Sequence, residues 1–304
     1  MGNSRSFEDL VAEGAAVPTE GWDFSWFEGR ATEARPSWGY ARTAGDRLTW
    51  ANTALDVQTG GGEVFDFALS RAAVQPPMMV AATEGWPPNV AKATALLRSR
   101  GVVVVAAAED APLPFADAAF DLVLSRHPVR AHWPEIARVL RPGGTYFAQH
   151  VGPRSAFELV EHFLLVLSRH PVRAHWPEIA RVLRPGGTYF AQHVGPRSAF
   201  ELVEHFLGPQ PEDVSGARDP ERERAGAEAA GLEVVGLRAE RLRMEFYDIA
   251  AVVHFLRKVI WMVPDFTVEA YEPQLRSLHE QIEATGPFVT HSTRHLFDVR
   301  KPLA

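Results

Sequence analysis

Short apolar runs alternate with helical patterns through the first half of the chain. Five runs have the length and apolar content of buried strands: Ala54-Leu55, Met78 to Thr83, Val102 to Val105, Leu122 to Ser125 and Thr145 to His150. Amphipathic segments lie between them, and Gly or Pro marks most changes from one pattern to the other. Strands that alternate with helices predict a parallel sheet with helices on both faces.

The last hundred residues continue the alternation of helices and strands. The expected elements are a charged helix at Pro220 to Ala230, a strand from Leu232, and helices at Tyr247 to Trp261 and Val268 to Ala284. The chain then reaches Phe288 to Val299, which we expect to be an antiparallel strand that closes the sheet. His291 and His295 would lie on this strand and not on one face of a helix, so we predict no metal site there.

Residues 1–50 are rich in aromatic side chains, namely Trp22, Phe24, Trp26, Phe27, Trp38, Tyr40 and Trp50. Beyond a short helix from Phe7 to Val11, this segment is predicted to consist of loops interrupted by Gly and Pro. The aromatic side chains either anchor an N-terminal arm to the core or form a lid over a ligand. We therefore divide the chain into an arm or lid at 1–50 and a main domain at 51–304.

A 43-residue segment occurs twice in tandem, because residues 122–164 and 165–207 are identical. Repeat architectures use several diverged units with atypical units at the ends, so the two identical copies are not a solenoid. They indicate a recent duplication, an engineered duplication or an error in the assembled sequence. We expect the first copy to supply the fourth strand, since Phe120-Asp121 leads directly into it. The second copy is then expected to pack as a strand–helix–strand–helix appendage.

Composition narrows the class of protein. The chain has 304 residues, of which 46% are hydrophobic, enough for one large core or for a domain with a lid. It has no cysteine, which excludes disulfides, thiolate metal sites and cysteine nucleophiles. The net charge of −7 argues against a nucleic-acid partner. No apolar run is long enough to span a membrane and there is no secretory signal pattern, so we expect a cytoplasmic protein.

The stretch T-A-L-D-V-Q-T-G-G-G-E, Thr53 to Glu63, combines a strand, a glycine turn and the start of a helix. Glycine lets the backbone approach a ligand closely, and a helix N-terminus offers free N–H groups. The dinucleotide fingerprint G-x-G-x-x-G fails here, because Phe65 occupies its last glycine position. Glu84 ends the second strand, where a carboxylate can accept from both ribose hydroxyls of a nucleotide; the alternative is a solvated residue at a strand end.

Three stretches together resemble class I S-adenosylmethionine-dependent methyltransferases of the small-molecule, methyltransferase domain 11 type. The glycine stretch matches the motif D-x-G-x-G-x-G at Asp56, Gly60 and Gly62, and carries Gln58 in place of the first glycine. The stretch E-D-A-P-L-P-F-A-D-A-A-F-D-L-V, which begins at Glu109, is similar to D-A-x-x-L-P-F-x-x-x-x-F-D-x-V. The stretch E-I-A-R-V-L-R-P-G-G-T-Y is similar to the helix, turn and strand that follow in that family.

The resemblance implies a fold and a cofactor. The expected fold is an α/β, Rossmann-like doubly wound sheet of seven strands with one antiparallel strand, and the expected cofactor is S-adenosyl-L-methionine. The methionine part would lie against Asp56, Gln58, Gly60 and Gly62. The remaining cofactor contacts are expected from Glu84 at the ribose, Glu109 or Asp110 beside the adenine, and Ser125 at the end of the fourth strand.

His127 follows the fourth strand, at the end of an open α/β sheet where ligands bind. It either acts as the base that deprotonates a hydroxyl or amine acceptor, or caps a loop. The first hypothesis is methyl transfer to O or N of a small molecule. The alternatives are an RNA or protein methyltransferase, and a cofactor-binding but inactive protein disabled by the duplication. The sequence identifies neither the acceptor nor the oligomeric state.

Overall fold

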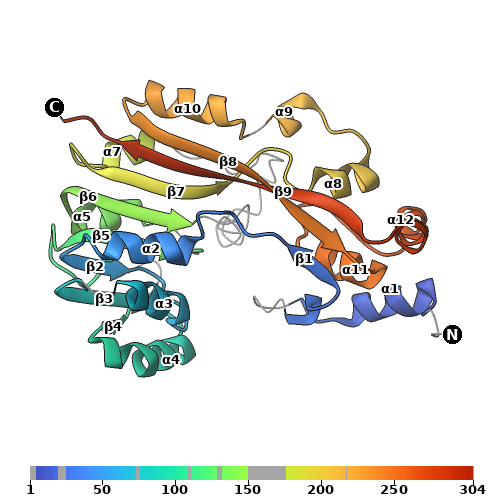
Figure 1. Cartoon of the computed structure of the whole chain (residues 1–304), viewed down its shortest axis with the longest axis horizontal. Coiled ribbons are helices and arrows are strands. Elements are labelled where there is room, and N and C mark those ends of the chain that lie inside the picture. The colour runs from blue at the N-terminus through green and yellow to red at the C-terminus, as the bar shows by residue number, and fades with distance from the viewer. Residues whose placement is uncertain are drawn as a thin grey trace. The chain divides into compact units, whose positions relative to one another are not determined.

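The structure is a computed structural model that describes residues 5–19, 25–72, 76–108, 111–128, 132–149, 176–216 and 218–303. The chain divides into two compact units, whose elements are labelled in Figure 1. The sheet unit contains Ser37–Val194, Arg218–Ala239 and Arg294–Ala304. The helical unit contains Met1–Pro36, Gly195–Ala217 and Glu240–Thr293.

The sheet unit contains most of the strands. Its strands are β2 (Thr53–Asp56), β3 (Met79–Glu84), β4 (Val103–Ala106), β5 (Phe120–Arg126), β6 (Leu140–Gln149) and β7 (Thr188–Val194). Its helices are α2 (Tyr40–Leu48), α3 (Glu63–Arg71), α4 (Pro87–Leu97), α5 (Trp133–Val139), α7 (Trp176–Val182) and α10 (Pro220–Ala229).

The helical unit contains α1 (Phe7–Ala16), β1 (Ala31–Glu33), α8 (Phe200–Leu207), α9 (Glu212–Ser215), α11 (Ile249–Lys258) and α12 (Glu272–Thr285). Two long strands, β8 (Glu233–Phe246) and β9 (Phe288–Arg300), have residues in both units. Ser6 begins α1 by accepting the N–H of Asp9, as a serine N-cap does. Asp248 begins α11 in the same way, by accepting the N–H of Ala251.

The described strands form one sheet of nine, in the order β1-β8-β9-β7-β6-β5-β2-β3-β4. Among the described strands, the pairings from β4 to β7 are parallel, whereas β9 is antiparallel to β7 and β1 is antiparallel to β8. The α/β class and the mostly parallel sheet are as predicted, and the last predicted strand is indeed antiparallel. The predicted number of seven strands is wrong.

The two additional strands come from segments that the sequence patterns did not assign to the sheet. β1 is three residues from the arm, where only loops were expected, and it pairs with the far end of β8. β7 comes from the second repeat copy, which we expected outside the sheet as an appendage. Its place between β6 and β9 corrects that expectation.

Each copy of the repeat contributes a strand to the interior of the sheet. The first copy supplies β5 beside β2, as predicted. β6 and β7 are the same sequence from the two copies, and they pair in parallel with identical residues opposite one another, from Thr145–Thr188 to Gln149–Gln192. The beginning of the second copy, where the first strand of the appendage was expected, lies outside the described residues.

The sheet unit has apolar cores on both faces of the sheet, because neighbouring residues of a strand point to opposite sides. Tyr146 and Tyr189 pack with residues of α5 and α7. Phe147 and Phe190 pack with residues of α2, α3 and α4. This alternation fits the nearly continuous apolar sequence of the strands, since a parallel sheet is buried on both faces.

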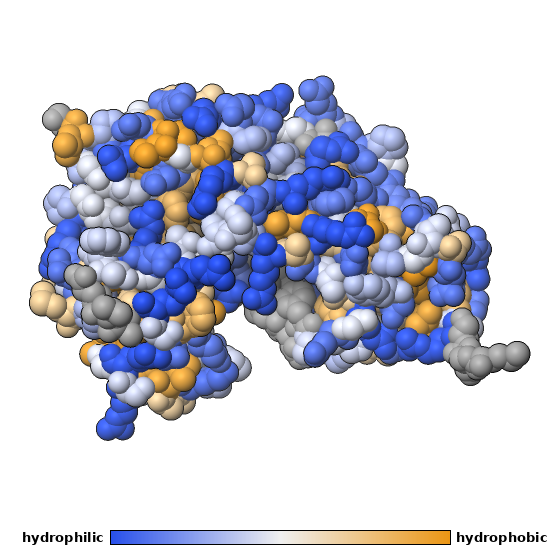
Figure 2. All heavy atoms as spheres, viewed as in Figure 1, coloured by the Kyte–Doolittle hydropathy of each residue, from blue (hydrophilic) through white to orange (hydrophobic). Residues whose placement is uncertain are grey.

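Hydrophilic and hydrophobic side chains are interspersed over the face of the molecule drawn in Figure 2. Among the described residues, no helix combines the length and the apolar character needed to cross a membrane.

Asp121 ties the beginnings of the central strands β2 and β5 together. Its Oδ2 accepts the backbone N–H groups of Asn52 and Thr53, each at 3.0 Å, and the Thr53 hydroxyl at 3.2 Å. Its Oδ1 accepts from Arg141 at 2.9 Å. Burial alone would raise the pKa of Asp121, but these hydrogen bonds outweigh burial and hold the pKa below its usual value. The carboxylate therefore fixes the relative register of the two strands that lead to the predicted site.

We expect Asp121→Asn to lower the free energy of unfolding by about 1–3 kcal/mol, because an amide nitrogen would face backbone donors that now bond to oxygen. Urea denaturation monitored by circular dichroism measures the change. Asp117→Asn is the matched control: Asp117 is 73% exposed and bonds only to Arg138 among the printed contacts. Its loss should be about 0.5 kcal/mol or less. Equal losses in the two variants would contradict the role given to Asp121.

Candidate functional site

The predicted cofactor residues of three separate strands meet at one edge of the sheet. Asp56 ends β2, Glu84 ends β3 and Ser125 lies near the end of β5. The register places Asp56 opposite Ala82 of β3 and Leu124 of β5, so the three carboxyl ends are neighbours. Ligands of open α/β sheets bind beyond such ends.

The turn between β2 and α3 has the conformation of a glycine-rich loop even at Gln58. Gln58 has φ 58°, in the left-handed region that glycine adopts most easily, as do Gly60 (φ 64°) and Gly62 (φ 87°). A Cβ on Gly60 would meet no atom within 4 Å, so the turn is open on that side. The replacement of the first motif glycine by Gln58 therefore leaves the backbone turn in place, at the cost of a strained residue.

Glu84 fixes this turn to the next strand. Its Oε2 accepts the N–H of Gly60 at 2.8 Å, and its Oε1 accepts the N–H groups of Gly85 and Trp86 at 3.0 and 2.9 Å. The side chain is 8% exposed. A carboxylate offers about four acceptor positions, so three backbone bonds leave room for a ligand hydroxyl.

Asp56 is buried at the centre of the site, with 7% of its surface exposed. Burial raises the pKa of Asp56 to about 7, and the neighbouring carboxylate of Glu84 adds to the rise, while Arg126 opposes it. A buried carboxyl with a raised pKa becomes easier to ionise when a cation is placed beside it.

The start of α3 is also acidic. Glu63 is the first residue of α3, and its carboxylate lies against Gly61 and forms an ion pair with Lys92. With Asp56 and Glu84 nearby, this edge would repel the phosphates of a dinucleotide. S-Adenosylmethionine has no phosphate, and its ammonium and sulfonium groups are cationic, so the residues present fit that cofactor.

Tyr40 is a site residue that the sequence did not single out. It is the first residue of α2, is 8% exposed, and stacks on Phe147 with ring centroids 4.6 Å apart. Its hydroxyl is buried near the backbone of Ser125, yet makes no hydrogen bond of good geometry with any described residue. Burial, followed by the charge of Asp56, raises the pKa of Tyr40 well above its usual value. A neutral hydroxyl therefore lies close to Ser125 and to the charge of Asp56.

The sequence offered little to identify Tyr40 beyond the aromatic content of residues 1–50. Trp38, from the same segment, donates from Nε1 to Gln192 of β7 at 2.6 Å. Both side chains are buried, so the segment around α2 is attached to the sheet.

Two of the remaining predicted site residues, Ser125 and His127, lie among the residues that the structure describes. Ser125 is 1% exposed, and its Oγ donates to the carbonyl of Val57 at 3.3 Å. His127 follows β5, is half-buried, has φ 54°, and its N–H bonds to the carbonyl of Gln149. Glu109 and Asp110 lie outside the described residues.

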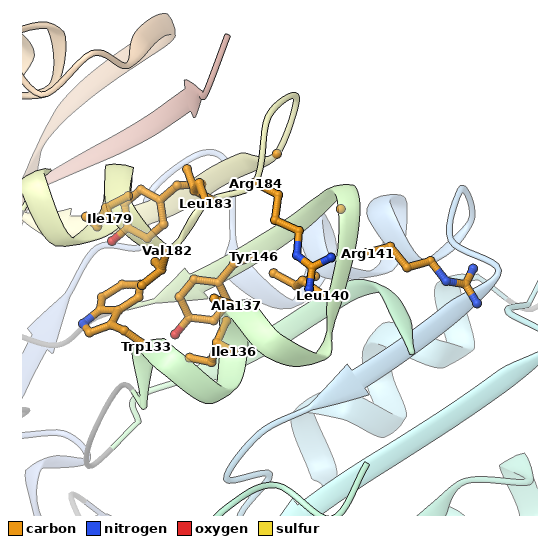
Figure 3. Close-up of a pocket in the computed structure, with 13 residues that line it drawn as sticks. Trp133, Ile136, Ala137, Leu140, Arg141, Tyr146, Ile179, Val182, Leu183 and Arg184 are labelled. Atoms are coloured by element: carbon orange, nitrogen blue, oxygen red, sulfur yellow. The ribbon is translucent and has the colours of Figure 1, made fainter. Parts of the chain in front are cut away.

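A small apolar pocket lies at the opposite end of the strands from this site. Equivalent residues of the two repeat copies line it, including Ile136 with Ile179 and Tyr146 with Tyr189 (Figure 3). Gly144 and Gly187, also in its lining, precede the first paired residues of β6 and β7. Helices pack 8–10 Å apart but strands only about 4.8 Å apart, so α5 and α7 cannot both sit squarely over adjacent strands. The hollow is explained by that mismatch.

Residues 55–148 match the family model for a methyltransferase domain. The match begins in β2 and ends in β6, and it includes the turn, Glu84 and Ser125. This supports methyl transfer as a generic activity and identifies no acceptor. A search of curated proteins gives no match.

Several solved structures are similar to parts of the chain. A Bacillus halodurans protein described as a methyltransferase is 17% identical, with 86% of this chain and 98% of that chain covered and a TM-score of 0.41. A Geobacter sulfurreducens S-adenosylmethionine-dependent methyltransferase, in complex with S-adenosyl-L-homocysteine, is 16% identical. The similarity covers 86% of this chain and 89% of that chain, with a TM-score of 0.37. A Haloferax volcanii complex of the Trm112 methyltransferase activator with a methyltransferase is 17% identical. The similarity covers 97% of this chain and 98% of that chain, with a TM-score of 0.35.

The pKa of Asp56 predicts an unusual pH dependence of stability. Because this pKa rises from 3.8 to about 7 on folding, the folded chain holds a proton that the unfolded chain releases between those values. Stability should therefore fall as pH increases through this window. We expect Asp56→Asn, which stays neutral, to lack this decline and to be more stable than the parent at pH 8 by up to about 4 kcal/mol.

Urea denaturation at pH 4, 6 and 8 measures this effect. Asp46→Asn is the control, because Asp46 is largely exposed on α2 and should leave the pH dependence unchanged. If Asp56→Asn and the parent lose stability in parallel between pH 4 and 8, the buried carboxyl is not the cause.

Proposed function

We propose that this protein binds S-adenosyl-L-methionine and transfers its methyl group to O or N of a small molecule. The observation that carries the proposal is the acidic edge formed by Asp56, Glu84 and the glycine turn, inside the segment that matches a methyltransferase domain. S-Adenosylmethionine, when bound, supplies an already activated methyl group. The protein then has to position both reactants and, where the acceptor carries a proton, remove it.

The roles of the residues follow from charge and hydrogen-bonding capacity. Asp56 balances the cationic methionine part, with the backbone of the Gln58–Gly62 turn alongside. Glu84 would accept from a ribose hydroxyl, and Glu109 or Asp110 would contact the adenine. Ser125 would contribute a further cofactor contact near the end of β5. We add Tyr40 to this set, because its buried hydroxyl makes no hydrogen bond of good geometry with a described residue.

His127 is the base in this proposal. It follows β5 directly, beyond the carboxyl end of the strand that carries Ser125. An imidazole with an ordinary pKa is partly neutral near pH 7, and a neutral ring can accept a proton from a hydroxyl or an ammonium group of the acceptor. The positive φ of His127 is the kind of backbone strain that is retained where a side chain must be aimed.

Titration calorimetry of S-adenosyl-L-homocysteine into the full chain tests cofactor binding. We expect micromolar affinity, and about tenfold weaker binding by Tyr40→Phe, since one hydrogen bond to the ligand is worth about 1.4 kcal/mol at most. The ligand-free stability of Tyr40→Phe should change little, because the buried hydroxyl makes no hydrogen bond of good geometry with a described residue. Tyr247→Phe is the matched control: Tyr247 is exposed and bonds to Glu245, outside the site.

Two outcomes would count against this assignment. If the folded parent chain does not bind S-adenosyl-L-homocysteine, the cofactor proposal fails. If Tyr40→Phe binds as tightly as the parent, Tyr40 is not among the ligand contacts and the other residues remain to be tested.

For the base, we expect His127→Gln to reduce kcat by about 10²- to 10⁴-fold while leaving the affinity for S-adenosyl-L-homocysteine unchanged. The rate is the formation of S-adenosyl-L-homocysteine over a panel of small hydroxyl and amine compounds. His205→Gln is a control on α8 in the helical unit, where the ring bonds to the carbonyl of Gln274. A His127→Gln variant with undiminished kcat would remove His127 from the reaction.

A further inference from the structure

A row of polar side chains crosses one face of the sheet near the carboxyl ends of its central strands. Arg126 of β5 pairs with Gln149 of β6, and Gln149 pairs with Gln192 of β7. Two positions earlier, each of these strands carries an apolar residue of the core that includes α2, namely Leu124, Phe147 and Phe190. Because side chains alternate between the two faces of a strand, the three polar side chains lie on that same face.

Asp56 and Tyr40 lie on this face as well. Ala54, two positions before Asp56 on β2, belongs to the same core, and Tyr40 stacks on Phe147 with ring centroids 4.6 Å apart. The charge of Arg126 is close enough to Asp56 to oppose the rise in its pKa. The row of polar side chains therefore begins beside the acidic edge and continues away from it, over strands that carry no acidic residue at these positions.

The hydrogen bonds of the row determine which groups it can offer a ligand. Arg126 Nε donates to Oε1 of Gln149 at 3.4 Å, and Trp38 Nε1 donates to Oε1 of Gln192 at 2.6 Å. Guanidinium and indole N–H groups only donate, so both glutamine oxygens are used as acceptors and both amide nitrogens keep two N–H donors. No described residue accepts from the amide nitrogen of Gln149. The row thus offers donors and a positive charge.

Two members of the row are accessible. Arg126 is exposed and Gln149 is half-buried, whereas Gln192 is 3% exposed and is held by Trp38. His127 follows Arg126 in the chain, and its backbone N–H donates to the carbonyl of Gln149 at 2.9 Å. The two accessible donors are therefore joined directly to the residue proposed as the base.

We propose that the methyl acceptor carries a carboxylate, and that Arg126 and the side-chain amide of Gln149 bind it. This step rests on the proposed function. A carboxylate offers only acceptor oxygens, and its charge complements the guanidinium, whose parallel N–H groups match two oxygens on one carbon. The amide adds a donor from the neighbouring strand, about 4.8 Å away. The hydroxyl or amine of the same molecule would then be presented to His127.

The test compares a carboxylate with its neutral amide. The full chain, with and without S-adenosyl-L-homocysteine, is titrated with sodium benzoate and separately with benzamide, at an ionic strength fixed with sodium chloride. Affinity comes from calorimetry and from the shift in Tm. We expect benzoate to bind about tenfold more tightly than benzamide or better, because only the carboxylate has a charge to pair with the guanidinium.

Variants assign the binding to the two side chains. We expect Arg126→Gln to weaken benzoate binding about tenfold or more, and Gln149→Leu to weaken it about three- to tenfold. Arg98→Gln, which removes the same charge from an exposed position of the same unit, should bind like the parent. Should Arg126→Gln not fold, Arg126→Lys replaces it: the charge is kept, the paired donors are lost, and binding should still weaken.

Three results would overturn the proposal. The first is a parent chain that binds benzoate no more tightly than benzamide. The second is an equal loss in Arg126→Gln and Arg98→Gln, since this would indicate a diffuse charge effect. The third is mutual exclusion of benzoate and S-adenosyl-L-homocysteine, since the carboxylate would then occupy the cofactor site.

The two proposals fail separately. Benzoate binding that depends on Arg126, without binding of S-adenosyl-L-homocysteine, would retain the carboxylate site and reject methyl transfer. Binding of S-adenosyl-L-homocysteine without any preference for benzoate would retain the cofactor site and reject the carboxylate site.

Discussion

The parallel pairing of β2 with β5 is the constraint on which the rest of the sheet unit depends. Asp121 holds the beginnings of the two strands together with three hydrogen bonds, from backbone and hydroxyl donors, and accepts a fourth from Arg141 of β6. Since the strands then run side by side in fixed register, Asp56 and Ser125 arrive at the same edge. Glu84 extends the arrangement to β3 through Gly60. The site is thus a consequence of strand register set at the opposite end of the sheet.

The groups with poorly satisfied polar atoms in the sheet unit lie mainly where strands end. Tyr40 has a buried hydroxyl, Asp56 is a buried acid, and Arg218 is a half-buried base whose Nε has no hydrogen-bond partner. Each costs stability in the ligand-free chain. The strained backbones of Gln58, His127 and Arg218 fall in the same regions. Stability alone does not explain why these unfavourable polar groups and strained backbones lie along one edge of the sheet.

The local sequence pattern was enough to predict the strands and the glycine turn, because these elements depend mainly on their own residues. The apolar runs became β2 to β6, the glycines formed the left-handed turn, and Phe288–Arg300 formed the last strand. Asp56 and Glu84 were predicted because a strand end can be recognised from its own residues. Tyr40 and Arg218 could not be recognised in this way, because what distinguishes them is their surroundings after folding. β1 is too short to give a pattern of its own.

The place of the second repeat copy could not be predicted for a different reason. Two identical segments have the same propensities and the same apolar faces, so the sequence cannot say which one lies in the sheet. In the structure strands of both copies do, and β6 and β7 have different neighbours. Gln192 accepts from Trp38 at 2.6 Å, whereas its twin Gln149 accepts from Arg126 at 3.4 Å.

The same identity explains how a sheet can accept a strand in its interior. The strand sequence shared by β6 and β7 can pair with β5 at one edge and with β9 at the other, and each copy has both edges. β6 keeps the neighbour on the β5 side, and β7 keeps the neighbour on the β9 side. Only the seam between the twins is new, and there like residues stack on like, tyrosine beside tyrosine and phenylalanine beside phenylalanine. The interface between β6 and β7 is thus made from the same residue types on both sides.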